Sequence, residues 1–320
     1  MSDECLTVTF FRGLSASGKS TLARELAAKT GAIRLNLDAL REMAGQPWSQ
    51  EHEKFIQNQQ DQMALAALRS GRSVIVDNTH LVEKGPRRLA TRIWEEGLNV
   101  NYDLIDVTVS SDECRHRNMV RRNSPTADDS LSVPDHVVVA QADLWAKEVK
   151  RGPWTIESIH RGLPEIVPVV PDSSLPEAAI IDLDGTLCNA AGKRGPYDFD
   201  LCGGDELHQH VLDFVNGWAG DMDRSKASDR YVLICTGRDA KYRQTCLSWL
   251  EDNNVPYDEL FMRAEGDVRR DSVIKLQIYN ENIRGEYNVT AALDDRLRVC
   301  NVWHSLGIPV FRVGDPNATF

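Results

Sequence analysis

A short stretch near the amino terminus, GLSASGKS, constrains the fold more than any other part of the sequence. It fits the pattern G-x-x-x-x-G-K-S/T, with Gly13, Gly18, Lys19 and Ser20 in register. An apolar run over 6–12 precedes it, and the helix-like segment STLARELAAK follows. Glycines at these places let backbone N–H groups close around phosphate oxygens at a helix N-terminus. The context therefore predicts a phosphate-binding loop between a strand and a helix.

Apolar runs alternate with helix-like segments, and this alternation predicts α/β layers with parallel sheets. Strands are predicted at 6–12, 73–77, 103–109, 178–183, 231–236, 289–293 and 309–313. Helices are predicted at 50–70, 84–97, 111–121, 206–219, 239–253, 270–282 and 296–306. Four prolines over 164–177 predict an extended linker. We therefore expect one domain over 1–163 and a second over 178–320.

Composition excludes some classes of protein. The 37 Lys and Arg residues against 48 Asp and Glu residues give a net charge of −11, which argues against an indiscriminate nucleic-acid coat protein. We find no apolar run of about 18 residues, the length that a membrane span needs. The start, MSDECLTVTFF, lacks the features of a signal peptide. Seven scattered cysteines predict reduced thiols in a cytoplasm-like compartment.

The N-terminal half offers candidate residues for phosphoryl transfer. Lys19 would reach the β- and γ-phosphates of a nucleotide, and the Ser20 hydroxyl, with Thr21 beside it, would help to hold Mg²⁺. In LNLDALR, Asp38 could accept a proton from an attacking hydroxyl, and Arg41 could hold a phosphate of the acceptor. The alternative is a helix-capping aspartate beside an exposed arginine.

Further candidates follow along this half. Asp77 ends a predicted strand, where it could be a Walker-B-like acid or a substrate contact. Arg117 and Arg121 share one face of a predicted helix and could form a lid over the transferring phosphoryl group. A solvated basic face is the alternative, and Arg122 leaves the choice of clamping arginine open by one residue.

The C-terminal half carries D-x-D-G-T in IIDLDGTL. Asp182 is the expected nucleophile that forms an aspartyl-phosphate, and Asp184 is the expected proton donor and acceptor. Carboxylates repel phosphate, so a metal ion is needed. Asp294 and Asp295 end another predicted strand, and together with Asp182 and Asp184 they would supply the oxygen ligands that Mg²⁺ prefers.

Other predicted strand ends complete a phosphatase-like pattern. Thr236 and Arg238 end the strand in LICTGR, and Lys275 lies in RRDSVIK. The order of these motifs resembles the haloacid-dehalogenase-type phosphatases. That resemblance implies Asp182 as nucleophile, Asp184 as acid and base, Thr236 and Lys275 as phosphate contacts, and Asp294 as a metal ligand.

The complete chain resembles the bacteriophage-type polynucleotide 5′-kinase/3′-phosphatases. The motifs GLSASGKST, LNLDALR, VDNTHL, RNMVR, IIDLDGTL, RGPYD, CTGR, EGDVRRDSVIK and LDDR occur in order. The resemblance implies a P-loop kinase-like parallel α/β sheet followed by a haloacid-dehalogenase-like Rossmannoid domain. It implies Asp38 as general base, Arg121 as clamp on the γ-phosphate and Arg117 as a further nucleotide contact. The residues expected to contact substrates are Arg41, Asp77, Arg194, Thr236, Gly237, Arg238, Asp271 and Lys275.

The predicted function is nucleic-acid end healing, with ATP or another NTP and Mg²⁺ as cofactors. The enzyme would phosphorylate 5′-OH ends and remove 3′-phosphates, with a 2′,3′-cyclic phosphate as a further candidate substrate. RNA or DNA ends, a functional link to a ligase and self-association are expected, and no membrane. One alternative is a small-metabolite kinase fused to a phosphatase, and another is a nucleic-acid-binding scaffold with decayed sites.

Overall fold

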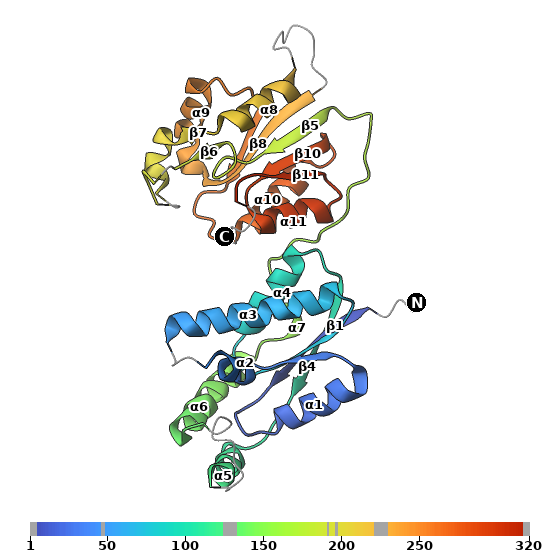
Figure 1. Cartoon of the computed structure of the whole chain (residues 1–320), viewed down its shortest axis with the longest axis vertical. Helices are drawn as coiled ribbons and strands as arrows, with labels where there is room; N and C mark the ends of the chain where they lie inside the picture. Colours follow the sequence, from blue (N-terminus) through green and yellow to red (C-terminus); the bar gives the residue numbers. More distant parts are fainter. Residues whose placement is uncertain are drawn as a thin grey trace. The chain divides into compact units, whose positions relative to one another are not determined.

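The computed structural model describes residues 5–45, 49–123, 133–190, 192–195, 198–220 and 230–315. The chain divides into two compact units at the step from Leu163 to Pro164 (Figure 1). Each unit is built on one parallel sheet, which confirms the predicted two-domain α/β class. Among the described residues, no helix has the length and apolar character needed to cross a membrane.

The N-terminal unit is a four-stranded sheet with the order β2-β3-β1-β4. Its strands are β1 (Leu6–Arg12), β2 (Ile33–Leu35), β3 (Val74–Asp77) and β4 (Val100–Asp106). Its helices are α1 (Lys19–Thr30), α2 (Leu37–Ala44), α3 (Gln50–Arg69), α4 (Lys84–Glu95), α5 (Ser111–Arg122), α6 (Asp135–Arg151) and α7 (Ile156–Ile159). The strand β1 lies centrally, where it pairs in parallel with β3 and β4.

Alternating side chains of β1 build a core on each face of this sheet. Phe10 packs with apolar residues of α3, α4 and α7 on one face. Phe11 packs with Ala23 and Leu26 of α1 on the other face. Both faces of β1 are therefore covered by helices, and its C-terminal end delivers the chain into the predicted phosphate loop.

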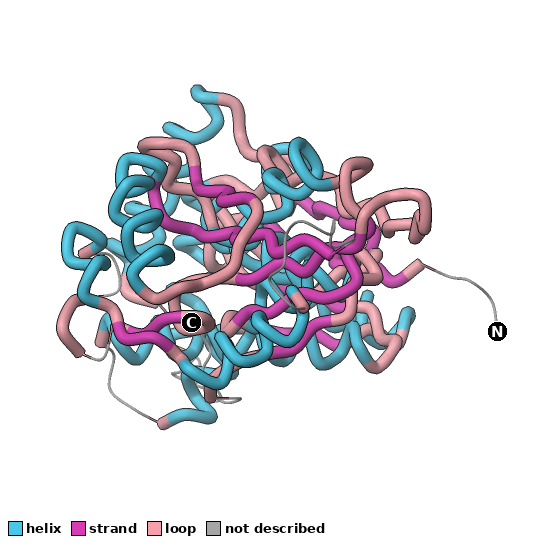
Figure 2. Tube along the Cα trace, turned by 90° about the horizontal axis from the view of Figure 1, so that it is seen from above, coloured by secondary structure: helices cyan, strands magenta, loops and turns pink. Residues whose placement is uncertain are grey.

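The C-terminal unit is a five-stranded parallel sheet with the order β11-β10-β5-β8-β9. Its strands are β5 (Glu177–Ile181), β8 (Arg230–Asp239), β9 (Glu259–Arg263), β10 (Asn288–Asp294) and β11 (Val310–Arg312), and a small hairpin joins β6 (Cys188–Asn189) to β7 (Glu206–Leu207). Its helices are α8 (Gln209–Ala219), α9 (Arg243–Asp252), α10 (Asp271–Ile278) and α11 (Leu297–Ser305). Figure 2 shows the strands of the chain in magenta and its helices in cyan.

Parallel pairing determines where the polar ends of these strands meet. The strand β5 pairs with β10 on one side and β8 on the other. Side chains of α8 and α9 pack on one face of the sheet, and α10 and α11 contact β8 and β10. Because β5, β8 and β10 are neighbours and parallel, their carboxyl ends meet at one edge, where α/β sites form.

Several boundaries differ from the predicted ones. The strand β4 begins three residues earlier than predicted, and α8 begins at Gln209 because the preceding residues pair with β6. The helix α6 was not predicted, because its β-branched start, HVVVA, weakens the helix pattern. The prediction of a separate linker over 164–177 stays a prediction. In the structure these residues cluster with the second unit, in which the Val169 amide donates a hydrogen bond to the Leu306 carbonyl oxygen at 2.8 Å.

Candidate active sites

The phosphate loop is the connection between β1 and α1. Gly13 and Gly18 have φ angles of 155° and 100°, in the left-handed region that favours glycine. A Cβ atom at position 13 would lie 2.6 Å from the carbonyl oxygen of Val107. The first glycine is therefore required by space as well as by conformation, and it lets the loop lie directly against the end of β4.

Lys19 is the first residue of α1, and its side chain turns back under the loop. It is only 7% exposed, and its Nζ donates a hydrogen bond to the Leu14 carbonyl oxygen at 2.6 Å. Burial lowers the pKa of Lys19 to about 8, although the charge of Asp77 acts in the opposite direction. Ser20 and Thr21 follow in the first turn of α1, so the five predicted loop residues lie together.

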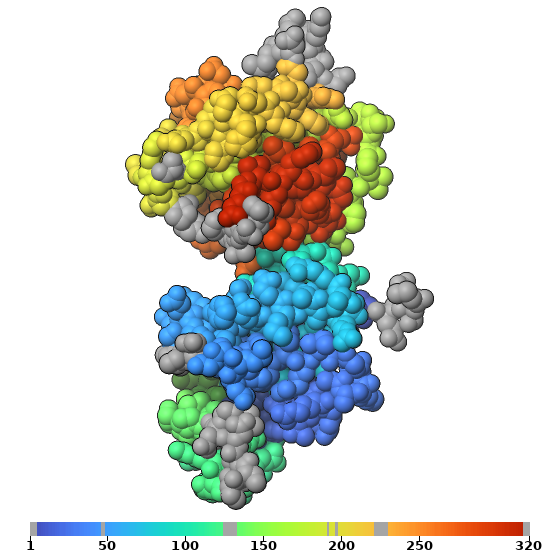
Figure 3. Space-filling model, viewed as in Figure 1, coloured from blue at the N-terminus to red at the C-terminus, as the bar shows by residue number. Residues whose placement is uncertain are grey.

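Asp38 and Arg41 lie on α2 and form an ion pair. Asn36 caps this helix by accepting a hydrogen bond from the Ala39 amide at 3.0 Å, so the alternative of Asp38 as the helix cap is wrong. Glu53 of α3, a helix at the surface of this unit in Figure 3, accepts from Nε and Nη2 of Arg41 at 2.9 and 2.8 Å. This bidentate contact fixes the guanidinium of Arg41 beside Asp38.

Asp77 is buried at the end of β3, next to the loop strand. Arg34 donates to its Oδ2 from Nε at 2.9 Å and from Nη2 at 2.5 Å, while Asn36 donates to its carbonyl oxygen at 2.5 Å. Its Oδ1 is buried and has no hydrogen-bond partner among the described residues. A buried oxygen with free acceptor capacity suits both predicted roles, the Walker-B-like acid and the substrate contact.

The predicted lid arginines lie on α5. Arg117 donates from Nη1 to the Ser17 carbonyl oxygen at 3.3 Å and from Nε to Glu113 at 2.7 Å, so it reaches the phosphate loop. The charge of Arg121 acts on the pKa of Lys19. Arg122 is exposed, whereas Arg121 is partly buried on the same face as Arg117. Arg117 thus contacts the loop while its side chain stays 46% exposed, and the choice of Arg121 as the clamp stays a prediction.

The second site is centred on Lys275 of α10, which bridges two carboxylates. Its Nζ donates to Asp182 Oδ1 and to Asp294 Oδ2, both at 2.7 Å, and all three side chains are buried. Burial raises the pKa of Asp182 to about 7, and the pKa of Asp294 also rises for this reason. Burial alone would lower the pKa of Lys275, but Asp182, Asp271 and Asp294 raise it well above its ordinary value.

Three of the predicted metal ligands meet beside this lysine. Asp182, Asp294 and Asp295 each offer an oxygen, and these oxygens lie within 4.8 Å of one another. Asp295 Oδ1 is buried without a hydrogen-bond partner among the described residues. An all-carboxylate set with an unpaired buried oxygen fits a hard divalent cation such as Mg²⁺. The carboxylate of Asp184 lies outside this group, so its predicted metal contact stays a prediction.

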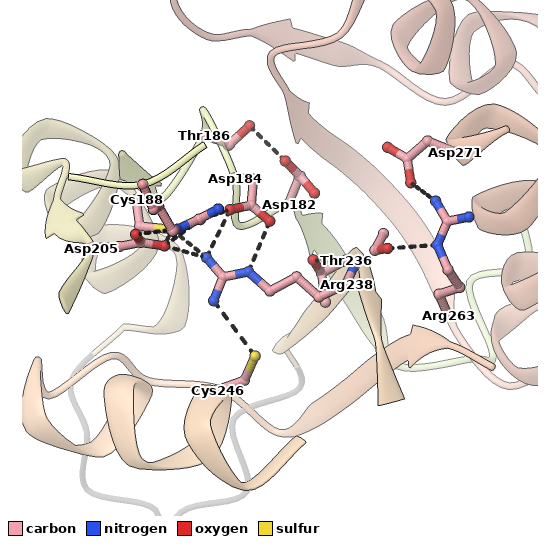
Figure 4. A network of polar contacts seen from close by, with 12 residues as sticks. Asp182, Asp184, Thr186, Cys188, Asp205, Thr236, Arg238, Cys246, Arg263 and Asp271 are labelled. Atoms are coloured by element: carbon pink, nitrogen blue, oxygen red, sulfur yellow. Dashed lines mark hydrogen bonds and ion pairs between the residues drawn. The ribbon is translucent and has the colours of Figure 1, made fainter. Parts of the chain in front are cut away.

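The Asp184 carboxylate instead pairs with two arginines (Figure 4). Arg238 donates to both of its oxygens at 2.8 Å, and Arg194 donates to Oδ1 at 2.6 Å. Asp205, which sequence reasoning missed, accepts from Arg194 and from Arg238 at 2.6 and 2.7 Å. Although burial opposes them, the two arginines hold the pKa of Asp184 below its ordinary value, which favours its ionised, proton-accepting form.

The end of β8 presents the remaining predicted contacts. Thr236 is fully buried, and its Oγ1 accepts a hydrogen bond from the Arg238 amide at 3.2 Å. A Cβ atom at Gly237 would lie 2.1 Å from Asp271 Oδ1, so only glycine fits there. Asp271 itself pairs with Arg296 at 3.1 Å and lies 3.7 Å from Lys275. All the predicted phosphatase-like residues thus gather at the carboxyl ends of β5, β8 and β10.

Sequence reasoning missed the residues that hold these groups in place. They are Arg34, Asn36 and Glu53 in the first site, and Asp205, Arg263 and Arg296 in the second. Arg296 follows directly after the Asp-Asp pair in LDDR, which was a usable signal. Glu53, Asp205 and Arg263 each lie on a different element from the side chain that they contact, so the periodicity of one helix or strand does not mark them.

The two sites define the class of the chain: an α/β protein that joins a phosphate-binding P-loop to a haloacid-dehalogenase-type aspartate site. Residues 176–317 match the family model described as the polynucleotide kinase PNKP phosphatase domain. Residues 8–146 match the model of an AAA domain. The two halves of the chain therefore match a phosphatase domain of this description and an AAA domain, in the order that the resemblance drawn from the motifs implied.

Individual proteins are similar either to most of this chain or to a part of it. A protein of Autographa californica nuclear polyhedrosis virus, named as a bifunctional polynucleotide kinase/RNA ligase, is 28% identical over 319 residues. That similarity covers 94% of this chain but only 41% of the viral protein. A chain in the Pnkp1/Rnl/Hen1 RNA repair complex is 25% identical, with 99% of this chain and 98% of that chain covered and a TM-score of 0.45. A gluconokinase of Sinorhizobium meliloti 1021 is 15% identical, with 43% and 74% covered and a TM-score of 0.32.

We predict that affinity for a nucleoside diphosphate, once its terminal phosphate is fully ionised, stays constant up to about pH 8 and decreases above it. Lys19 binds phosphate in its charged form, and its lowered pKa of about 8 means that the neutral form prevails at higher pH. The limiting decrease is about tenfold per pH unit. Calorimetric titration with ADP over this range measures it. In the Lys19→Arg variant the guanidinium stays charged, so any affinity for ADP that remains should not decrease above pH 8. If the affinity of the wild-type chain did not depend on pH in this range, Lys19 would not be the phosphate-binding group.

We predict that Asp205→Asn destabilises the C-terminal unit by about 3 kcal/mol or more, because it leaves two buried arginines short of a counter-charge. The side chains of Arg194, Arg238 and Asp205 are 2%, 0% and 1% exposed. Urea unfolding followed by circular dichroism measures the effect. The matched control is Glu206→Gln, whose pair with Lys193 is 57% exposed on both sides and should cost less than about 1 kcal/mol. Equal losses would contradict the prediction.

Proposed function

We propose that this chain is a bifunctional enzyme that heals nucleic-acid ends: it transfers the γ-phosphate of ATP or another NTP to a 5′-OH end and removes a 3′-phosphate. The observation that carries the proposal is the presence of two complete phosphate-handling sites in one chain, one of them in a domain of the polynucleotide kinase phosphatase family. The chain spans less than half of the length of its viral relative. The polynucleotide kinase named there supports the choice of substrate.

In the kinase reaction, the loop amides and Lys19 would hold the phosphates of the NTP, and Ser20 would help to hold Mg²⁺. Asp38, paired with Arg41, is exposed on α2 and can take the proton of an incoming 5′-hydroxyl. Arg41 would hold the phosphate on the 3′ side of the acceptor nucleotide, with Glu53 fixing its orientation. Arg121 would stabilise the charge that develops on the transferring phosphoryl group.

In the phosphatase reaction, Asp182 would attack phosphorus, so that a phosphorus–oxygen bond to the protein forms as the bond to the 3′-oxygen breaks. Asp184 would give a proton to the leaving 3′-oxygen and then take one from the water that hydrolyses the aspartyl-phosphate. Lys275 and Thr236 would contact the phosphate oxygens. Mg²⁺ on Asp182, Asp294 and Asp295 would offset the repulsion between carboxylates and phosphate.

The two reactions need not oppose each other, because they act on opposite sides of a strand break. Their products are a 5′-phosphate and a 3′-hydroxyl, the termini that a ligase joins. We therefore propose RNA or DNA ends as substrates and a ligase as the next enzyme to act. A 2′,3′-cyclic phosphate as a further substrate, self-association and a cytoplasm-like compartment stay predictions.

We predict that the two activities can be lost separately. Lys19→Ala should abolish phosphorylation of an oligonucleotide that carries a 5′-OH and a 3′-phosphate, and leave phosphate removal intact. Asp182→Asn should do the reverse, because it removes the nucleophile. Gel analysis of both ends with ATP and Mg²⁺ measures both activities in one reaction.

Matched controls are Lys29→Ala at the other end of α1 and Asp172→Asn, both at exposed positions, which should change neither activity. Loss of both activities in either active-site variant would refute the two-site model. Competition adds a test of the substrate class. A kinase that single-stranded oligonucleotides do not inhibit would support the small-metabolite alternative.

A further inference from the structure

A cavity of about 290 Å³ lies beside the phosphate loop, in the N-terminal unit alone. Gly13 and Leu14 of the loop form one wall, and residues 107–110, which connect β4 to α5, form another. Trp145 of α6 lies on its side. Its volume is at the lower end of the range for ligand sites, which suits a group the size of a single nucleobase.

The cavity has an aromatic wall over a buried cation. The guanidinium of Arg12 lies 5.0 Å from the centre of the Trp145 ring and 4.9 Å from that of Trp154. Arg12 is only 5% exposed, and it donates to the Trp154 carbonyl oxygen at 2.6 Å. An indole beside a guanidinium offers a flat, polarisable surface on which a heteroaromatic ring can stack.

Hydrogen-bonding groups lie at the rim of the same cavity. Each oxygen of Asp106 accepts one hydrogen bond from Arg12, at 2.6 and 2.7 Å, which leaves each oxygen a second lone pair. The Asp106 side chain is 42% exposed, so it can be reached from solvent. Thr108 and Ser110 also line the cavity, and the Ser110 hydroxyl accepts a hydrogen bond from the Glu113 amide at 3.2 Å. Such a rim can accept hydrogen bonds from an exocyclic amino group.

A hydrogen bond and a shared residue connect the wall of the cavity to the phosphate loop. Gln141 of α6 lies one helical turn before Trp145, and its Oε1 accepts a hydrogen bond from the Ser15 amide of the loop at 2.9 Å. Gly13 belongs both to the cavity wall and to the loop. The cavity therefore lies next to the loop that would hold the phosphates of a ligand.

We propose that this cavity binds the nucleobase of the phosphate donor, with the base stacked on Trp145 and its exocyclic amino group directed to Asp106. The inference rests on the proposed function in taking a nucleotide as the ligand of the loop. It goes further by placing the base and by assigning a preference. Bases with an exocyclic amino group, as in adenine, should be favoured over uracil, which has none.

The test compares ADP with inorganic pyrophosphate, which occupies the phosphate loop but has no base. In the full-length chain with Mg²⁺, Trp145→Ala should weaken ADP binding about tenfold or more, in the range of a lost base–aromatic stack, and leave pyrophosphate binding unchanged. Trp145→Phe should retain most of the affinity. ADP should also bind the wild type more tightly than UDP.

The matched control is Leu144→Ala, a partly exposed neighbour on α6, which should change neither dissociation constant. Unchanged ADP affinity in Trp145→Ala would overturn the proposal. Equal weakening of ADP and pyrophosphate would also overturn it, because Trp145 would then support the loop and not the base. Unchanged pyrophosphate binding reports that the N-terminal unit of the variant is folded, and phosphatase activity reports the same for the other unit.

A second measurement needs no variant. Photolabelling of the wild-type chain with 8-azido-ADP should modify the peptide that contains 106–110 or the one that contains Trp145, and labelling elsewhere would refute the site. Neither experiment requires an acceptor. If the chain binds ADP through Trp145 but phosphorylates no 5′-OH end, only the proposed function is refuted. If the chain is an active kinase but the label lies elsewhere, only the proposed nucleobase site is refuted.

Discussion

The ion bridge from Lys275 to Asp182 and Asp294 is the interaction on which the C-terminal site depends. Without it, two buried carboxylates would face each other in a region of low dielectric constant, and at least one would take up a proton. The lysine comes from α10, while the aspartates follow β5 and β10, so the bridge also fixes a helix against two strand ends. In the proposed reaction, the same ammonium that stabilises the fold there would also contact the phosphate.

Lys19 and Lys275 are both buried lysines, but the groups around them shift their pKa values in opposite directions. Burial lowers the pKa of both amines, but three nearby carboxylates more than compensate at Lys275. At Lys19 the opposing charges are weaker, so its pKa is about 8 and its main partner is a neutral carbonyl oxygen. The proposed binding of phosphate would therefore stabilise the charge of Lys19 further, whereas the charge of Lys275 is stabilised by the protein itself.

Sequence reasoning predicted most of what lies at strand ends, because strand alternation and parallel pairing bring such residues together. The P-loop, the D-x-D-G-T stretch and the Asp-Asp pair were predictable for this reason. Glu53, Asp205 and Trp145 were not. Glu53 and Asp205 each contact a predicted arginine, and Trp145 packs beside the buried Arg12, but each lies on another element. Such contacts depend on tertiary packing, which no local pattern encodes.

In the proposed reaction Asp184 has to act first as an acid and then as a base, and its two arginine partners bear on both roles. Arg194 and Arg238 favour its ionised form, which suits activation of water, yet the first step of the proposed reaction needs the protonated form. In the proposed reaction, a phosphate near these arginines would bring negative charge toward them and compete for their hydrogen bonds. Both effects would favour protonation of Asp184 while the substrate is bound. Once the leaving 3′-oxygen has taken that proton, the two arginines again stabilise the carboxylate as the base for the second step.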